Sequence, residues 1–274
     1  MATRSWINKG VVNIVLIVIG ILFVIPLLWV LTAAFSKNAS LSVQWPSPVS
    51  LDSFKQVMTS SNGLAFANSF YLSAGTAVIT VVLSMVAAYP LSRYQLKFKR
   101  PFLYTILFAT GLPITAMMVP VYEIYNKLNI TDSLLWTGAF LVASSLPFAI
   151  WMTKNFMDGV PVELEEAAWV DGSTVLNGLM RVILPLMRPG LAAVGIFIFV
   201  GAWGNFFVPF ILIQTASLDP AAVTIYQFFS QYGMVAYGQL AAYSILYAIP
   251  VVVLYVISSR WLGGAFNFGG AVKG

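Results

Sequence analysis

Residues Val11 to Phe35 read VVNIVLIVIGILFVIPLLWVLTAAF, a run of mostly apolar residues without a charged side chain. A helix of about 20 apolar residues crosses the hydrocarbon core of a bilayer, so this stretch is long enough for one span. It is much longer than the apolar core of a signal peptide and follows Arg4 and Lys9. The run predicts an uncleaved first transmembrane helix, although Ala33-Ala34 resembles a cleavage site and leaves processing open.

Similar apolar runs recur along the whole chain. Of the 274 residues, 59% are hydrophobic and 8% are charged, so most of the surface must face lipid or other apolar helices. The predicted spans are Val11 to Phe35, Phe66 to Tyr89, Phe102 to Tyr125, Leu134 to Met152, Pro189 to Ile213 and Ala242 to Leu262. Internal prolines are expected to kink several of them. The sequence predicts an all-α membrane protein with six transmembrane helices and a single domain, 1–274.

The positively charged residues indicate the orientation of these spans. If the N-terminus is cytoplasmic, all of the 14 Lys and Arg except Lys37, Lys55 and Lys127 fall in cytoplasmic segments. This bias predicts that both termini are cytoplasmic. The cations lie at the ends of apolar runs rather than on one face, so the net charge of +5 indicates topology and membrane lipid, not nucleic acid.

Several kinds of chemistry lack their usual side chains. The chain has no His and no Cys, so zinc sites, thiol nucleophiles and disulfides are not expected, and we predict no metal and no cofactor in this chain. With few carboxylates inside the spans, a membrane-embedded enzyme is disfavoured. The same scarcity argues against a secondary transporter or channel that works alone, because such proteins carry coupling ions on intramembrane acids or show an internal repeat.

The segment between the fourth and fifth predicted spans reads DGVPVELEEAAWVDGSTVLNGLMRVILPLMRPGL, Asp158 to Leu191. Pro161 suits the first position of a helix, and the acidic residues after it favour the N-terminal end of the helix dipole. Gly172 is expected to stop this helix, and Ser173 to cap a second, amphipathic helix that Pro185 interrupts. An ordinary interfacial hairpin would show the same pattern.

Within this segment, Glu166-Ala167-Ala168, three residues, Gly172, nine residues, Val182, one residue and Leu184-Pro185 resemble the EAA loop of binding-protein-dependent ABC importer permeases. Val182 stands where that motif usually has isoleucine. With this motif and its six predicted spans, the chain as a whole resembles the smaller permease of the carbohydrate-uptake subfamily. The loop is therefore expected to be a cytoplasmic helical coupling loop between spans four and five.

The resemblance implies a mechanism and partners. A second permease would complete the pathway as a heterodimer, two ATPase subunits would bind ATP and Mg²⁺ below it, and an extracytoplasmic sugar-binding protein would deliver the substrate. The chain has no phosphate-binding G-x-x-x-x-G-K-[ST] loop, in agreement with an ATPase activity that resides in partners. The chain would be a multi-pass protein of a bacterial or archaeal cytoplasmic membrane. The residues expected to couple ATPase closure to transport are Glu165, Glu166, Ala167, Ala168, Asp171, Gly172, Val182, Leu184 and Pro185.

The substrate class follows from the resemblance alone. It implies an oligosaccharide or a related polyol or glycerophosphodiester, with a non-sugar solute as the alternative. Trp203, Asn205 and Glu123 are candidates for lining the pathway, although an interhelical hydrogen bond for Asn205 and a paired interfacial position for Glu123 are the plainer interpretations. The aromatic residues Tyr226, Phe228, Phe229 and Tyr232 are candidates for contact with the binding protein or for stacking on sugar rings, or they mark the membrane boundary.

Overall fold

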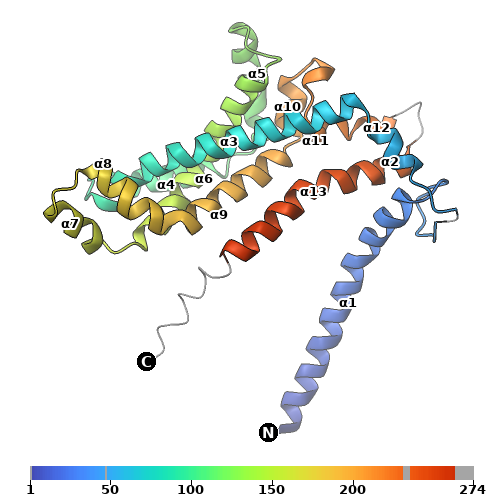
Figure 1. Cartoon of the computed structure of the whole chain (residues 1–274), viewed down its shortest axis with the longest axis horizontal. Coiled ribbons are helices and arrows are strands. Elements are labelled where there is room, and N and C mark those ends of the chain that lie inside the picture. Colours follow the sequence, from blue (N-terminus) through green and yellow to red (C-terminus); the bar gives the residue numbers. More distant parts are fainter. Residues whose placement is uncertain (1, 47, 231–234, 263–274) are drawn as a thin grey trace. The chain divides into compact units, whose positions relative to one another are not determined.

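The computed structural model describes residues 2–46, 48–230 and 235–262, and their regular structure is helical apart from one isolated bridge between Ser36 and Val49. The long elements in Figure 1 are α1 (Ala2–Ala34), α3 (Ser60–Arg93), α6 (Leu134–Asp158), α9 (Leu184–Trp203) and α13 (Tyr237–Leu262). The shorter ones include α2 (Asp52–Val57), α4 (Lys99–Ala109), α5 (Ile114–Lys127), α10 (Phe207–Leu212), α11 (Ala221–Thr224) and α12 (Gln227–Ser230).

Five helices in the described ranges are long and apolar enough to cross a membrane, and the number becomes six if one bent pair counts as a span. This confirms an all-α membrane protein. The bent pair is α4 and α5, which meet at an angle of 91°, so the predicted third span is not one continuous helix. Pro113 precedes α5 in an extended conformation (φ −66°, ψ 123°), which a helix cannot pass through.

The fifth predicted span also differs from the observed helices. α9 already begins at Leu184 and ends at Trp203, and the chain resumes as the short α10. Between them, Asn205 Oδ1 accepts a hydrogen bond from the N–H of Val208 (3.0 Å) and so satisfies a free donor in the first turn of α10. The apolar run is therefore interrupted at the asparagine.

The described helices form two compact units. One comprises the described parts of Met1–Gly63 and Thr224–Ile249, and the other those of Leu64–Val223 and Pro250–Gly274. In the second unit, one apolar core is built on α3, α5, α6, α9 and α10 from Leu72, Met118, Leu141, Ala202, Val208 and Leu212. α9 packs closely on α6 at Gly190, where an added Cβ would lie 2.6 Å from Phe156 Cγ.

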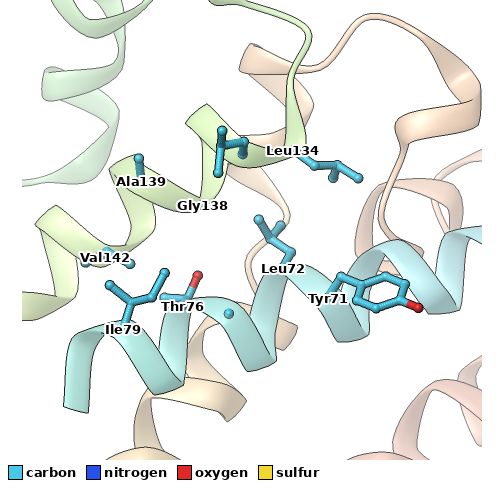
Figure 2. A pocket seen from close by; sticks show the side chains of 10 residues that line it. Tyr71, Leu72, Thr76, Ile79, Leu134, Gly138, Ala139 and Val142 are labelled. Carbon is cyan, nitrogen blue, oxygen red and sulfur yellow. The ribbon is translucent and has the colours of Figure 1, made fainter. Parts of the chain in front are cut away.

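A cavity of about 370 Å³ opens between α3 and α6, and Figure 2 shows Leu72 and Thr76 of α3 facing Leu134 and Val142 of α6 across it. Apart from hydroxyl groups such as that of Thr76, its lining is apolar. A cavity of this kind offers apolar contacts but few hydrogen bonds, and so suits hydrocarbon rather than a hydrated solute.

Candidate functional site

The segment after α6 folds into two short helices and a π-turn before α9 begins. They are α7 (Glu163–Val170), α8 (Val175–Gly178) and η1 (Leu179–Ile183). α7 and α8 lie together at one end of α3 and α9 (Figure 1). The predicted helix, turn and helix are therefore present, within a single compact unit.

The boundaries of α7 follow from its terminal residues. Glu163, Glu165 and Glu166 occupy its first turn, as expected from the helix dipole, although the helix begins two residues after Pro161. At the other end, the N–H of Ser173 donates to Ala168 O (2.9 Å) and that of Gly172 to Trp169 O (3.0 Å), the paired bonds of a Schellman motif. Gly172 has a φ of +87°, which favours glycine. It stops the helix, as predicted.

Two details of the second helix differ from the predictions. Its N-cap is Thr174 rather than Ser173, since the Thr174 hydroxyl accepts from the N–H of Asn177 (3.3 Å). Pro185 does not interrupt the helix but lies in the first turn of α9, directly after the π-turn. A proline cannot donate to the carbonyl four residues earlier, and the wider turn changes the hydrogen-bond register at that place.

The apolar residues of the second helix divide between two surroundings. Leu179 and Ile183 are buried in a core cluster with Ala88 and Tyr89 of α3, Met157 of α6, and Val160 and Met187. Val175, Leu176 and Met180 are 46%, 67% and 48% exposed. The buried pair attaches the loop to the spans, whereas the exposed residues have no cover within the described chain.

A buried ion pair joins α7 to the end of α3. Arg93 Nε lies 2.8 Å from Glu165 Oε2, and the two side chains are 3% and 1% exposed. The hydroxyl of Tyr89 donates to the other carboxylate oxygen, Oε1. Glu165 is thus fully engaged inside the molecule, whereas its neighbour Glu166 is exposed.

The guanidinium of Arg93 also reaches the end of α6. Nη1 donates to Met157 O and Nη2 to Val160 O, each at 3.2 Å. Beside it, Ser92 donates to Asp158 Oδ1 (2.6 Å), and Lys154 pairs with the same carboxylate. Because a buried charge is tolerated when its hydrogen bonds are satisfied, this cluster holds α3, α6 and α7 in one arrangement.

The outer surface of α7 and of the turn after it is acidic and apolar. Glu166, Ala167, Asp171 and Gly172 are exposed there, and Val170 is 88% exposed. Ala168, Val182, Leu184 and Pro185 are half-buried. Exposed apolar residues next to charges are typical of a surface that binds another protein.

The candidate pathway residues lie in different environments. Trp203 is 3% exposed and stacks on Phe199, with ring centroids 5.8 Å apart. Asn205 is half-buried and engaged in the cap of α10. Glu123 is exposed on α5. None of the three lines the cavity between α3 and α6.

The aromatic candidates for a partner contact also divide. Tyr226 and Phe229 are 55% and 52% exposed, with ring centroids 6.5 Å apart. Phe228 is 7% exposed and packs on Tyr243, so its ring faces the interior of its own unit. Tyr232 lies outside the described residues.

A further polar cluster, which the sequence did not suggest, lies at the start of α6. Asp132 accepts from the backbone N–H groups of Gln214 and Thr215 (both 2.9 Å) and from the Thr215 hydroxyl (2.6 Å). The Thr215 hydrogen bonds, above all, lower the pKa of Asp132. Partial burial, and then repulsion by Asp132, raise the pKa of Asp219. The segment after α10 is thereby fixed to the α5–α6 turn.

The comparisons with known proteins agree on one family. Residues 80–264 match the family described as "Binding-protein-dependent transport system inner membrane component". The chain is 29% identical to the diacetylchitobiose uptake system permease protein DasC of Streptomyces coelicolor, over 99% of this chain and 98% of that protein. It is 30% identical to the trehalose transport system permease protein SugB of Mycobacterium tuberculosis, over 91% and 92% of the two chains.

A solved structure shares the fold. A chain of a bacterial ABC transporter involved in the import of the acidic polysaccharide alginate superimposes with a TM-score of 0.80 at 21% identity, over 94% of this chain and 98% of that one. At this identity the likeness establishes the helical architecture.

Proposed function

Because this chain belongs to the family of inner membrane components of binding-protein-dependent transport systems, we propose that it forms part of the pathway of an ATP-driven importer for a carbohydrate. Its full-length relatives include permeases named for diacetylchitobiose and trehalose uptake, which supports a sugar over a non-sugar solute. The acidic and apolar outer surface of α7, on a loop attached to the spans by a buried ion pair, carries the proposal.

The two adjacent glutamates have different parts in this proposal. Glu166, Ala167 and Gly172 lie on the exposed side and would contact an ATPase subunit. Glu165 is a positioning residue, because it faces Arg93 and Tyr89 rather than solvent. When the ATPases close, α7 would be displaced, and the Arg93–Glu165 pair would carry this displacement to α3 and α6 as a rigid-body movement.

The proposed assembly contains partners that this chain does not supply. A second permease completes the pathway, two ATPases bind and hydrolyse ATP with Mg²⁺, and a binding protein delivers the sugar on the opposite side. The positive-inside bias supports cytoplasmic termini and a cytoplasmic position for α7 in a prokaryotic membrane. Tyr226 and Phe229 remain candidates for contact with the binding protein because their rings are exposed.

Docking on α7 is tested by crosslinking, for which the natural chain is convenient because it contains no cysteine. Single variants Ala167→Cys and Leu176→Cys, labelled with a benzophenone maleimide in the assembled importer, are expected to crosslink to an ATPase on irradiation. Phe98→Cys is the control, since Phe98 is 78% exposed but lies outside α7 and α8. Equal ATPase crosslinking from all three positions would contradict docking on α7.

Orientation and substrate need separate measurements. A membrane-impermeant maleimide added to intact cells is expected to label Lys37→Cys but not Phe98→Cys; the reverse result would invert the topology. For the substrate, the importer is purified with its native partners and reconstituted. Its ATPase activity is expected to rise with the sugar-loaded binding protein, and stimulation by amino acids but no sugar would favour the non-sugar alternative.

A further inference from the structure

The loop that follows α1 contains a small polar pocket in a chain that is otherwise strongly hydrophobic. The pocket has a volume of about 190 Å³. Trp45 lines it too, and its polar lining comes from Thr32, Ser36, Asn38, Ser40, Ser42 and Gln44. It lies wholly within the first compact unit and is distinct from α7.

The loop that builds this pocket is closed at its base. Ser36 pairs with Val49 in the isolated bridge, and the N–H of Ser50 donates to Phe35 O (2.8 Å). Trp29 Nε1 donates to Ser40 O (2.9 Å), which ties the loop to α1. A compact loop with adjacent ends, held by its own contacts, is an Ω-loop, a type that frequently carries function.

Two amide side chains around the pocket are available to a ligand, whereas the hydroxyls of Thr32, Ser40 and Ser42 already form hydrogen bonds within the chain. The side-chain amides of Asn38 and Gln44 make no hydrogen bond to any residue that the structure describes, and each offers two donors and one acceptor. Trp45 is 85% exposed. An aromatic ring beside neutral donors and acceptors matches a sugar, whose C–H face packs on the ring while its hydroxyls bond to the amides.

We propose that this pocket is a binding subsite for one neutral sugar unit on the extracytoplasmic side of the importer. The inference rests on the proposed function for the orientation and for the solute class. The pocket's volume of about 190 Å³ suits one sugar ring rather than an oligosaccharide. The lining contains no charged side chain, which favours a neutral unit over a uronic acid.

Two other interpretations of Trp45 are weaker. Tryptophan is common at the membrane boundary, where it needs only an apolar contact and one partner for its N–H. That role does not account for six polar lining residues beside it. Docking of a binding protein would use the same exposed ring, and the experiment separates this outcome from sugar binding.

The test uses the assembled importer in nanodiscs without its binding protein, and measures saturation-transfer NMR with glucose, arabinose and N-acetylglucosamine as probes. At least one sugar is expected to bind the wild type, and Trp45→Ala should weaken its affinity about two- to tenfold. Trp45→Phe, which keeps an aromatic ring, is expected to retain part of the wild-type sugar affinity. Leu41→Ala is the matched control, because Leu41 is 74% exposed on the same loop but does not line the pocket.

The outcomes are distinct from those for the proposed function. Retention of ATPase stimulation by the loaded binding protein in Trp45→Ala, together with weaker sugar affinity in the NMR titration, supports the subsite. Absence of transfer from all three sugars to the wild type overturns it, even if import is intact. Unchanged sugar affinity in Trp45→Ala with weaker affinity for the binding protein also overturns it, and assigns the loop to docking.

Discussion

Arg93, the last residue of α3, and Glu165, in the first turn of α7, form the only ion pair in the described part of the chain whose two side chains are both buried. The two residues are 72 positions apart in the sequence. Three of the four partners of the guanidinium belong to the ends of α6 and α7 or to the residues between them. The pair therefore joins the candidate docking helix to two spans.

The adjacent glutamates of α7 are expected to differ in stability and in coupling. Glu165→Ala leaves the Arg93 charge buried and should reduce the free energy of unfolding by about 3–5 kcal/mol. Glu166→Ala removes an exposed group and should change it by less than about 0.5 kcal/mol, but should weaken association with the ATPase. Thermal unfolding and ATPase co-purification separate the two effects. Equal stabilities of the two variants would contradict the positioning role of Glu165.

A double-mutant cycle tests the pair itself. Arg93→Met with Glu165→Leu removes both charges, so the double variant should be more stable than the sum of the single losses predicts. The expected coupling energy is about 0.5–3 kcal/mol. If the double variant is stable but hydrolyses ATP without transport, the pair transmits movement. If transport per ATP is normal, the pair only supports folding.

The sequence predicted the helices more completely than it predicted the site. The apolar runs and the Gly172 stop are local signals, and the structure contains them. The burial of Glu165 beneath Arg93 could not be derived locally, since three glutamates share the first turn of α7 and nothing in the sequence indicates which one faces a span. The one available signal was on the other side of the contact: Arg93 follows Tyr89 by four residues at the end of α3, so both side chains lie on the same face of that helix and could hold a carboxylate.

Other differences have the same origin in tertiary packing. The internal prolines predicted kinks, but the 91° angle between α4 and α5 depends on how the chain passes Pro113 and could not be read from the sequence. Phe228 looked equivalent to Tyr226 and Phe229, but its ring is covered by Tyr243. The cluster at Asp132 joins residues more than 80 positions apart, beyond the reach of any periodicity.

Substitution of Gly172 separates backbone strain from close approach to a partner. Beyond its two neighbours in sequence, no atom in the described part of the chain lies within 4 Å of a Cβ placed there, so the φ of +87° is the internal constraint. Asparagine tolerates a positive φ better than valine does, so Gly172→Asn should reduce stability less than Gly172→Val. Both should uncouple transport if the ATPase approaches the bare backbone. Full sugar uptake with normal ATPase stimulation in Gly172→Val would refute any coupling role.

Two glycines of α9 offer a matched pair for packing. A Cβ at Gly190 would lie 2.6 Å from Phe156 Cγ. At Gly201, apart from the backbone of its own helix and its two neighbours, no described atom would lie within 4 Å of one. Gly190→Ala should cost about 1–3 kcal/mol of stability because α9 must move away from α6. Gly201→Ala should not destabilise the isolated chain, and thermal unfolding in detergent compares the two. A stable Gly190→Ala variant would show that α6 and α9 pack less closely.

The acids near the start of α6 predict opposite pH dependences. Hydrogen bonds from Thr215 and Gln214 lower the pKa of Asp132 below its unfolded value. Its stabilising effect is therefore present above that unfolded value, about pH 4, and is lost as the pH falls through the lower folded pKa. The difference in Tm between wild type and Asp132→Asn should be largest near neutral pH and should shrink in acid.

Asp219 behaves in the opposite sense, because its raised pKa means that the folded state holds its proton more tightly than the unfolded chain. Ionisation of Asp219 thus opposes folding above its folded pKa, and Asp219→Asn should raise Tm at pH 7 but not below about pH 4. Asp52→Asn, an exposed change in the other compact unit, controls for net charge. Thermal unfolding measured from pH 3 to pH 8 compares the variants. Parallel pH profiles for Asp132→Asn and Asp219→Asn would contradict the opposed environments of the two carboxylates, because only opposed pKa shifts give opposed slopes.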